Sequence, residues 1–196
     1  MNLTYIKVNR KKRKITQNII RSNTFAFLGD NIRFGGTGKF FNSKNISIED
    51  NVYLGRDFYI EAISNVRICS GTMMGPKVTI IAGSHNYNSD DLKAIPYDKR
   101  IVDTPVIIGQ NVWIGANVTI CPGAVIEEGA VIGMGTVVSG RVERNTVVVL
   151  SKQIVINKRN EDIYNHLKDN NKLYNLICTL GEFQICKREE FFLHRQ

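Results

Sequence analysis

One histidine of the chain has surroundings that indicate chemistry. His85 lies in the segment GSHNYNSDDLKAIPYDKRIVDTP, a polar stretch between two regions with a regular six-residue pattern. A long insertion in an otherwise regular chain is usually a functional loop. Imidazole changes its charge near neutral pH, so a positioned histidine can act as a general base on a hydroxyl group. For His166 and His194, which fall in the C-terminal region, we expect surface positions.

Polar side chains follow His85 directly and could contact a hydroxylated acceptor. Asn86 and Asn88 offer hydrogen bonds, and Tyr87 offers a ring that can stack on a sugar. No serine or cysteine lies in a GxSxG or similar motif, so the pattern requires no covalent nucleophile. The four cysteines form no CxxC pair and have no metal-ligand spacing. We therefore expect no metal site, and reduced thiols in a cytoplasmic protein.

The region after this loop repeats every six residues. From Ile108 the chain reads IGQNVW, IGANVT, ICPGAV, IEEGAV, IGMGTV and VSGRVE. The first position is always aliphatic, and the fifth is small or β-branched. The fourth position of the first five hexads is Asn or Gly, the residues that best tolerate a left-handed backbone, so a sharp corner recurs there.

This spacing predicts short strands. The fifth residue of one hexad and the first of the next are two apart, so both side chains point to the same side of a strand. Short strands joined by corners wind into a prism in which each coil covers the apolar interior of the next. Upstream, one register contains Ile48, Leu54 and Ile60. A second register, shifted by two residues, contains Ile68, Met74 and Ile80.

The first coil is expected to begin at Leu28 and Phe34. An aromatic cluster should cap it, consisting of Phe25, Phe27, Phe40 and Phe41.

The hexads resemble those of the hexapeptide-repeat acyltransferases. VIIGQNVWIGANVTICPGAVIEEGAVIGMGTVV is similar to the signature block of the galactoside, maltose and surface-polysaccharide O-acetyltransferases. GPKVTIIAGSHNYN resembles the segment that carries their catalytic histidine. The resemblance spans roughly residues 45–148. It implies an all-β fold, a left-handed parallel β-helix with three hexads per coil, which is an exception to the usual right-handed crossover. It also implies a homotrimer.

The resemblance further implies an activity. The protein would move acetyl from acetyl-CoA, its co-substrate, to a sugar hydroxyl of a bacterial surface polysaccharide or its precursor, with His85 as general base. Acceptor contacts would come from Asp57, Glu61 and Asn65, one coil before the histidine. Gly55 stands where the family aligns an asparagine, which leaves the identity of the sugar open.

Cofactor contacts are implied at turn positions of the later hexads. They carry over to Ala116, Met134, Ser139 and Gly140, together with Trp113. Met134 and Gly140 replace a small residue and a lysine that are common in relatives, and the GNPA-like turn after the coil is missing. Binding at the nucleotide end of CoA is therefore expected to differ.

Other functions fit parts of the pattern. N-acetylation of a nucleotide-linked amino sugar or of an antibiotic uses the same prism. A γ-type carbonic anhydrase needs three histidine ligands, and only His85 lies in the repeat region. A non-catalytic β-helix scaffold is favoured by the altered cofactor positions and disfavoured by the intact histidine loop.

We expect three regions along the chain. Residues 1–24 form a basic segment, because the first 23 residues hold seven of the basic side chains and no acidic one, in a chain of net charge +8. Residues 7–21 could contact an anionic membrane surface, and no nucleic-acid partner is expected. The β-helix follows at 25–150 with its loop at 84–105, and then a helical tail at 151–196 with Asn160 as N-cap. No signal peptide or membrane span is expected.

The residues between the inward positions should face outward. They are Trp113, Thr119, Val125, Val131 and Val137. With three hexads per coil, Trp113, Val131 and Val149 should form one apolar stripe, which usually marks an interface. We therefore predict a trimer with active sites at its seams.

Overall fold

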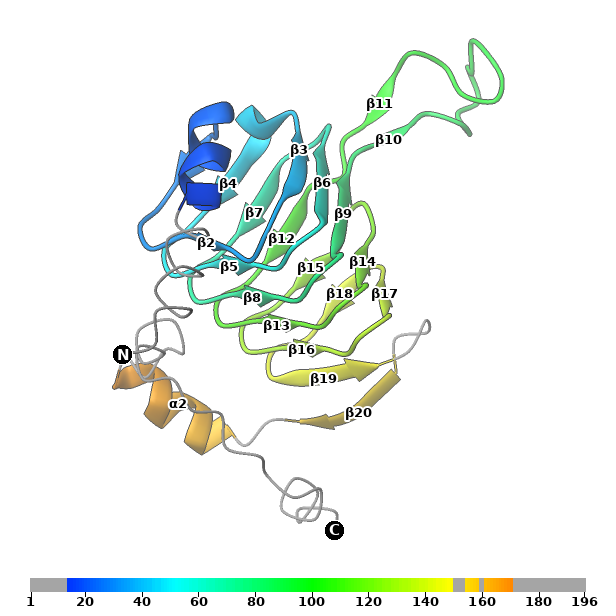
Figure 1. Cartoon of the computed structure of the whole chain (residues 1–196). Helices are drawn as coiled ribbons and strands as arrows, with labels where there is room; N and C mark the ends of the chain where they lie inside the picture. The colour runs from blue at the N-terminus through cyan, green and yellow to red at the C-terminus, as the bar shows by residue number, and fades with distance from the viewer. Residues whose placement is uncertain (1–13, 150–153, 159–160, 171–196) are drawn as a thin grey trace.

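Three sheets wrap around one apolar interior, and the chain visits each of them once in every coil (Figure 1). The structure is a computed structural model that describes residues 14–149, 154–158 and 161–170. Six coils follow one another along the axis, and strands of neighbouring coils pair in parallel. The predicted left-handed parallel β-helix is confirmed.

The strands are short, and each sheet takes one strand from every coil it crosses, apart from β20, which is added to the seven-stranded sheet after the last coil. The six-stranded sheet contains β1 (Phe27–Leu28), β4 (Ile46–Ile48), β7 (Val66–Ile68), β12 (Val106–Ile108), β15 (Val125–Ile126) and β18 (Arg141–Val142). The seven-stranded sheet contains β2 (Arg33–Phe34), β5 (Tyr53–Leu54), β8 (Met73–Met74), β13 (Trp113–Ile114), β16 (Val131–Ile132), β19 (Thr146–Val149) and β20 (Ile154–Lys158). The five-stranded sheet contains β3 (Gly38–Phe41), β6 (Phe58–Ala62), β9 (Thr79–Ala82), β14 (Thr119–Ile120) and β17 (Val137–Val138). A 3-10 turn, η1 (Ser43–Asn45), precedes β4.

The prism has three edges where the chain turns from one sheet to the next. We name the edge between the seven- and five-stranded sheets the glycine edge, after Gly55, Gly75 and Gly115. The arm edge joins the five- and six-stranded sheets, and the tail edge joins the six- and seven-stranded sheets. At the glycine edge an added Cβ on Gly115 would lie 2.6 Å from the backbone nitrogen of Met134 in the next coil. Only glycine therefore allows the coils to approach this closely.

The core follows the register predicted from the repeat. The largest fully buried side chains include Ile48, Leu54, Ile60, Ile68, Met74, Ile80, Ile108, Ile114, Ile120 and Ile126. Recurring corners have the left-handed backbone expected at the fourth hexad position. The φ angles there are 55° at Asn111 and Asn117, 79° at Gly123, 72° at Gly129 and 76° at Gly135. The two-residue shift is present as well, since Ile48 pairs with Ile68 whereas Ile114 pairs with Ile132.

The N-terminal end of the prism is closed by aromatic side chains and a helix. Residues 14–22 are helical, and Ile19 and Ile20 pack against the core. The rings of Phe25 and Phe40 meet edge to face, with centroids 5.0 Å apart. Five of the seven basic residues of the predicted N-terminal segment lie outside the described residues; the other two are Lys14 and Arg21.

Two members of the predicted aromatic cap do not belong to it. Phe27 and Phe41 are 53% and 42% exposed. Each is the strand neighbour of an inward residue, Leu28 and Phe40 respectively, and the two-residue period of a strand turns it outward.

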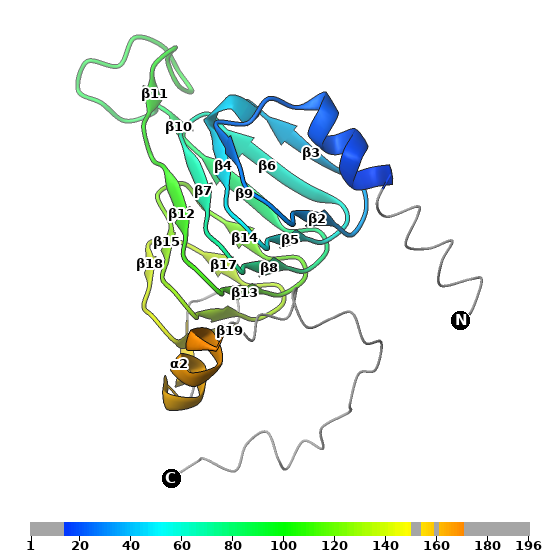
Figure 2. The same cartoon turned by 90° about the vertical axis from the view of Figure 1, so that its left-hand side faces the viewer.

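The loop at 84–105 is an arm that leaves the prism after β9 and returns before β12. Its base is a two-stranded antiparallel ribbon of β10 (Ser84–His85) and β11 (Ile101–Val102). In Figures 1 and 2 the arm projects from the solenoid at the end of the molecule opposite the C-terminal helix.

The C-terminal region differs from the helical tail predicted for 151–196, because Ile154–Lys158 form strand β20. It pairs antiparallel with β19 and continues the seven-stranded sheet. The helix α2 (Glu161–Asp169) follows, with Glu161 and Asp162 in its first turn. The predicted N-cap Asn160 and the residues from 171 onward lie outside the described residues.

Helix α2 is held at the tail edge. The Tyr164 hydroxyl donates a hydrogen bond to Glu128 (3.0 Å) and accepts one from the Asn111 amide (3.1 Å). Lys168 pairs with Glu128 as well. Partial burial alone would raise the pKa of Glu128, but the hydrogen bonds from Lys168 and Tyr164 outweigh it and lower that pKa.

Candidate active site

Both ends of the arm are tied together where they meet the prism. The amide of Thr104 donates to the hydroxyl of Ser64 (3.0 Å), and Ser64 is only 5% exposed. The carbonyl of Thr104 accepts from the amides of Gly83 and Gly123, both at 3.2 Å. The incoming strand, the outgoing strand and the coils on either side are thus joined at one point of the arm edge.

His85 is the second residue of the arm and is exposed. Its imidazole stacks on the ring of Tyr97, with centroids 3.9 Å apart and an interplanar angle of 15°. Within the part of the chain that the structure describes, no group hydrogen-bonds either imidazole nitrogen. Both nitrogens are therefore available to a substrate, while the face of the ring is covered on one side.

A charged cluster organises the arm beyond His85. The carboxylate of Asp98, almost fully buried, accepts hydrogen bonds from Nε and Nη2 of Arg100 and from the Asn86 amide. Arg100 also pairs with Asp91 at 2.8 Å. The Arg100 guanidinium holds the pKa of Asp98 well below its usual range, and the Asp98 and Asp91 carboxylates raise that of Arg100.

The predicted acceptor residues on the arm divide into two kinds. Tyr87 is 68% exposed and Asn88 is also exposed, so both can meet a ligand. The side-chain amide of Asn86 donates to Ser89 (2.9 Å) and to Asp98 (3.1 Å). Its two N–H groups are committed within the arm, which leaves Oδ1 as the group that could face an acceptor.

The predicted acceptor residues on the preceding coil lie in β6 and beyond each of its ends. Asp57 stands on the glycine edge in a left-handed corner (φ 58°), and Asn65 stands on the arm edge. Glu61, between them, accepts a hydrogen bond from the Tyr59 hydroxyl at 2.9 Å. The two residues flank the five-residue strand β6, which at about 3.3 Å per residue spans roughly 15 Å. One subunit therefore cannot present both to the same hydroxyl group.

The predicted cofactor residues also divide between two edges. Ala116 and Met134 are stacked in successive coils at the glycine edge, where the Gly135 amide donates to the carbonyl of Ala116 (2.9 Å). Ser139 and Gly140 form a corner of the arm edge, between β17 and β18. The five-stranded sheet separates the two pairs.

These corners have a feature suited to a ligand with amide carbonyls. Within the described residues, the backbone N–H groups of Ala116, Met134, Ser139 and Gly140 have no hydrogen-bond acceptor. Met134 is 72% exposed, so apolar surface lies beside these donors. A pantetheine chain carries amide groups along an otherwise apolar chain, and the corners fit that pattern.

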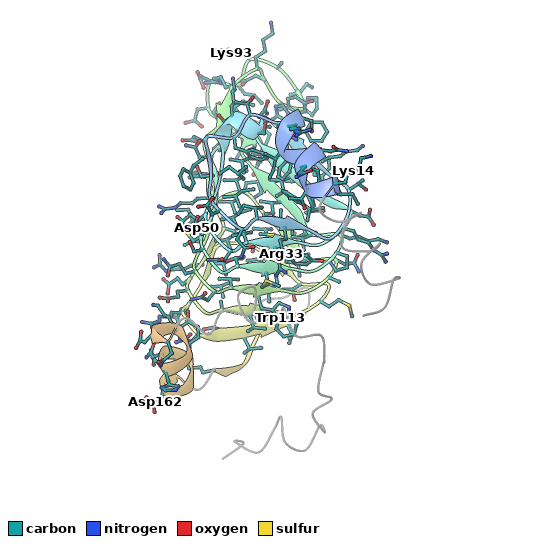
Figure 3. All side chains as sticks on the ribbon, turned by 60° about the vertical axis from the view of Figure 1, so that its left-hand side comes forward. Lys14, Arg33, Asp50, Lys93, Trp113 and Asp162 are labelled. Atoms are coloured by element: carbon teal, nitrogen blue, oxygen red, sulfur yellow. The ribbon has the colours of Figure 1, made fainter. Side chains whose placement is uncertain are left out.

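Trp113 belongs to an apolar row on the outside of the seven-stranded sheet. It is 56% exposed, and its side chain points away from the prism (Figure 3). In register with it lie Tyr53, Met73, Val131 and Val147.

The prediction that Val149 is the third member of the apolar stripe is wrong. Val131 pairs with Val147, because the corner between β17 and β18 is two residues shorter than the corner between β14 and β15.

Several residues of this site could not be assigned from the sequence. Ser64 and Thr104 fasten the arm, Tyr97 stacks on His85, and Asp98 and Arg100 form its charged cluster. The run YDKR contains three of them and carries both signs of charge, but only the structure shows which side chains meet.

No group of three or more His, Cys, Asp or Glu side chains suited to a metal ion occurs among the described residues. Over the same residues, no helix is long and apolar enough to cross a membrane.

Comparison with known proteins agrees with this architecture. Residues 105–140 match the family model of the bacterial transferase hexapeptide (six repeats). Among curated protein sequences, none is similar enough to count as a match. Among solved structures, a maltose O-acetyltransferase from Clostridium difficile 630 is similar, with a TM-score of 0.63 and 27% identity over 80% of this chain and 89% of that one.

Two further similar structures are complexes with coenzyme A. A galactoside acetyltransferase in complex with coenzyme A has a TM-score of 0.64 and 26% identity, over 87% of this chain and 77% of that one. A mutant of an N-acyltransferase from Bacillus cereus, in complex with dTDP and coenzyme A, shares the fold at 18% identity, with a TM-score of 0.55 over 80% of this chain and 96% of the other. The resemblance to hexapeptide-repeat acetyltransferases is thereby confirmed.

Proposed function

We propose that this protein transfers acetyl from acetyl-CoA to a hydroxyl group of a carbohydrate, with His85 as the general base. The observation that carries the proposal is the placement of His85. Its imidazole is exposed and stacked on one face, and no hydrogen bond from the described residues occupies either nitrogen, at the head of the arm that interrupts the repeat.

The geometry supports acyl transfer from a thioester. One nitrogen of His85 would take the proton of the acceptor hydroxyl as its oxygen attacks the thioester carbonyl. The carbon–sulfur bond then breaks, and the imidazolium returns the proton to the leaving thiolate. A free backbone N–H at a corner would stabilise the negative charge on the carbonyl oxygen. General-base catalysis of this kind contributes about 10²- to 10⁴-fold.

The split of the predicted residues between two edges supports a site shared by two copies of the chain. His85, Ser139 and Gly140 lie on the arm edge, and Ala116 and Met134 lie on the glycine edge. A ring with threefold symmetry joins unlike surfaces of neighbouring copies, and we propose that it sets the arm edge of each copy against the glycine edge of the next. A single pantetheine chain between them would then reach both sets of free N–H groups. We therefore propose a homotrimer with three active sites at its seams.

The apolar row on the seven-stranded sheet fits the same arrangement. The arm carries exposed apolar side chains at Ile95, Ile101 and Val102. A neighbouring arm that crosses the seam would cover Trp113 and Val131, and this would bury both apolar surfaces.

The proposed acceptor is a sugar of a bacterial surface polysaccharide or its precursor. Tyr87 and Asn88 on the arm would contact it from one copy, and Asp57 from the glycine edge of the next. The basic N-terminal segment would bring the enzyme to an anionic membrane surface, where each cationic residue contributes about 1 kcal/mol.

Thioester consumption measured with a thiol reagent tests the activity. The panel should contain neutral mono- and oligosaccharides, an amino sugar and a nucleotide-linked amino sugar. Treatment of the product with hydroxylamine then separates an ester, which it cleaves, from an amide, which it leaves intact. An ester on a neutral sugar supports the proposal. An amide product identifies an N-acetyltransferase, and the absence of turnover on the whole panel favours a scaffold.

A further inference from the structure

We infer that Tyr97 is a positioning residue for the base, and that its ring sets the plane in which the His85 imidazole meets the acceptor. This inference rests on the proposed function of His85. The carrying observation is the stack itself, with ring centroids 3.9 Å apart and planes within 15°.

An exposed histidine has to be held by something to act as a precise base. The torsion that turns the imidazole about its Cβ–Cγ bond is broad and weakly restrained. Catalytic bases are usually oriented by a third group, often a carboxylate or carbonyl bonded to one ring nitrogen. Among the described residues no such hydrogen bond to His85 is present. The stacked ring of Tyr97 is the contact that fixes the imidazole plane.

The stack is dictated by the backbone on either side of it. The sequence neighbours of the two rings, Asn86 and Asp98, are joined by two hydrogen bonds. The amide of Asp98 donates to the carbonyl of Asn86 (3.0 Å), and the side-chain amide of Asn86 donates to the carboxylate of Asp98 (3.1 Å). The amide of Asn86 in turn donates to the carbonyl of Arg100 (3.0 Å). His85 and Tyr97 are therefore opposed in a fixed register.

The stack leaves the chemistry of the imidazole free. A ring that covers the face of His85 occupies neither nitrogen, so one nitrogen can take the hydroxyl proton while the other remains open to solvent or a neighbouring copy. Tyr97 is itself 47% exposed, so it lies at the surface that an acceptor approaches. Loss of its ring should reduce the rate of proton removal more than it weakens binding of either substrate.

The first test is spectroscopic and needs no turnover. Protein labelled in the histidine ring gives imidazole carbon and proton signals, and the His85→Ala variant identifies those of His85. A stacked tyrosine shifts them upfield by its ring current. Tyr97→Leu should remove this shift, and Tyr97→Phe should retain it, because the ring and not the hydroxyl makes the contact. An unchanged signal in Tyr97→Leu would overturn the inference.

The second test is kinetic and uses the same variants on the best acceptor of the panel. Tyr97→Leu should lower kcat by about ten- to a hundredfold, the size of effect expected when a catalytic group is misplaced by about 1 Å, with KM for acetyl-CoA nearly unchanged. Tyr97→Phe, which keeps the ring, should retain the kcat of the wild type. Phe27→Leu, at an aromatic residue of similar exposure on the six-stranded sheet, is the matched control and should change neither readout.

The outcomes distinguish the role of Tyr97 from the role of His85. A Tyr97→Leu variant that loses the ring-current shift but keeps wild-type kcat would refute the positioning role and leave His85 as the base. A His85→Ala variant with wild-type turnover would refute the proposed function, and the inference with it. The Arg100 Nε–H signal shows whether the arm keeps its structure. If this signal is lost in Tyr97→Leu, the role of Tyr97 is purely structural, and that outcome would also refute the inference.

Discussion

The hydroxyl of Ser64 accepts a hydrogen bond from the backbone amide of Thr104, a residue forty positions further along the chain (3.0 Å). This bond closes the base of the arm that carries His85. Ser64→Ala leaves a partly buried N–H without its acceptor, which costs about 1–3 kcal/mol. We expect the free energy of unfolding in urea to fall by that amount and kcat to fall with it. Ser47→Ala, on the outside of the six-stranded sheet, is the control; equal stability of both variants would contradict the role of Ser64.

His85→Ala should nearly abolish acetyl transfer. The loss of a general base lowers turnover by about 10²-fold or more. Binding of acetyl-CoA, measured by calorimetry, and the circular dichroism spectrum should stay as in the wild type, because the side chain is exposed and makes no hydrogen bond within the described chain. Residual turnover above about a tenth of the wild-type value would remove His85 from the role of base.

Two inactive variants should complement each other if the site is shared between copies. His85→Ala damages the arm edge, and Ala116→Trp blocks the glycine edge. When the two are unfolded together and reassembled at equal amounts, about a quarter of the seams of a cyclic ring should combine two intact edges. Activity should therefore recover to about a quarter of the wild-type value. A mixture that stays inactive, although light scattering shows mixed oligomers, would place the whole site in one subunit.

Val131→Asp tests the apolar row beside the seam. Val131 lies between Trp113 and Val147 in register, and a carboxylate there is costly if a neighbouring copy covers it. Oligomer mass and turnover should fall together. A control with Ser47→Asp, on the six-stranded sheet, should leave both unchanged. A fully active monomer at assay concentration would refute the shared site.

The charged cluster of the arm gives a pH dependence with a definite sign. Because the Arg100 guanidinium lowers the pKa of Asp98, ionised Asp98 stabilises the folded arm above the carboxyl pKa of the unfolded chain, near 3.9. That contribution is lost as the pH falls through the lowered pKa. The protection of the Asn86 and Arg100 amides against exchange, relative to the unfolded chain at the same pH, should stay high from pH 7 to about 4 and fall only in stronger acid. Asp98→Asn should show low protection already at pH 7.

Much of the fold could be predicted because the hexad pattern is local. The corner residues, the inward residues such as Ile114 and Ile120, and the two-residue shift before Ile68 all follow from spacing along the chain. Val149 is not in the apolar row because the corner between β17 and β18 is two residues shorter than the one between β14 and β15. The outward-facing residues do not reveal where along the chain a corner is shortened. Phe27 and Phe41 differ from the prediction for a related reason: composition indicates a cluster, but the two-residue period of the strand turns both side chains outward.

The site was predictable only in part. His85 was identified by the break in the repeat, and the open N–H groups of Ala116, Met134, Ser139 and Gly140 are compatible with the ligand assigned by resemblance. The partners of His85 could not be found in this way. Tyr97 is twelve residues from it within an irregular segment, and Ser64 is separated from Thr104 by one coil and the arm. Such contacts depend on how the arm folds back, for which the sequence has no period.

The uniform stacking of the coils means that distance along the axis is quantised in this molecule. Parallel strands lie about 4.8 Å apart, so the arm base on the third coil and Ser139 on the fifth are separated along the axis by about 9.6 Å. No point substitution can adjust that interval by a fraction, since a coil is either present or absent. Insertion of one complete coil between β14 and β17 would preserve every corner and every inward residue, yet move Ser139 a full step away from His85. Divergence in the length of acyl donor that such a prism accepts is therefore expected to proceed by whole coils, or by changes in the arm, and not by gradual stretching of the solenoid.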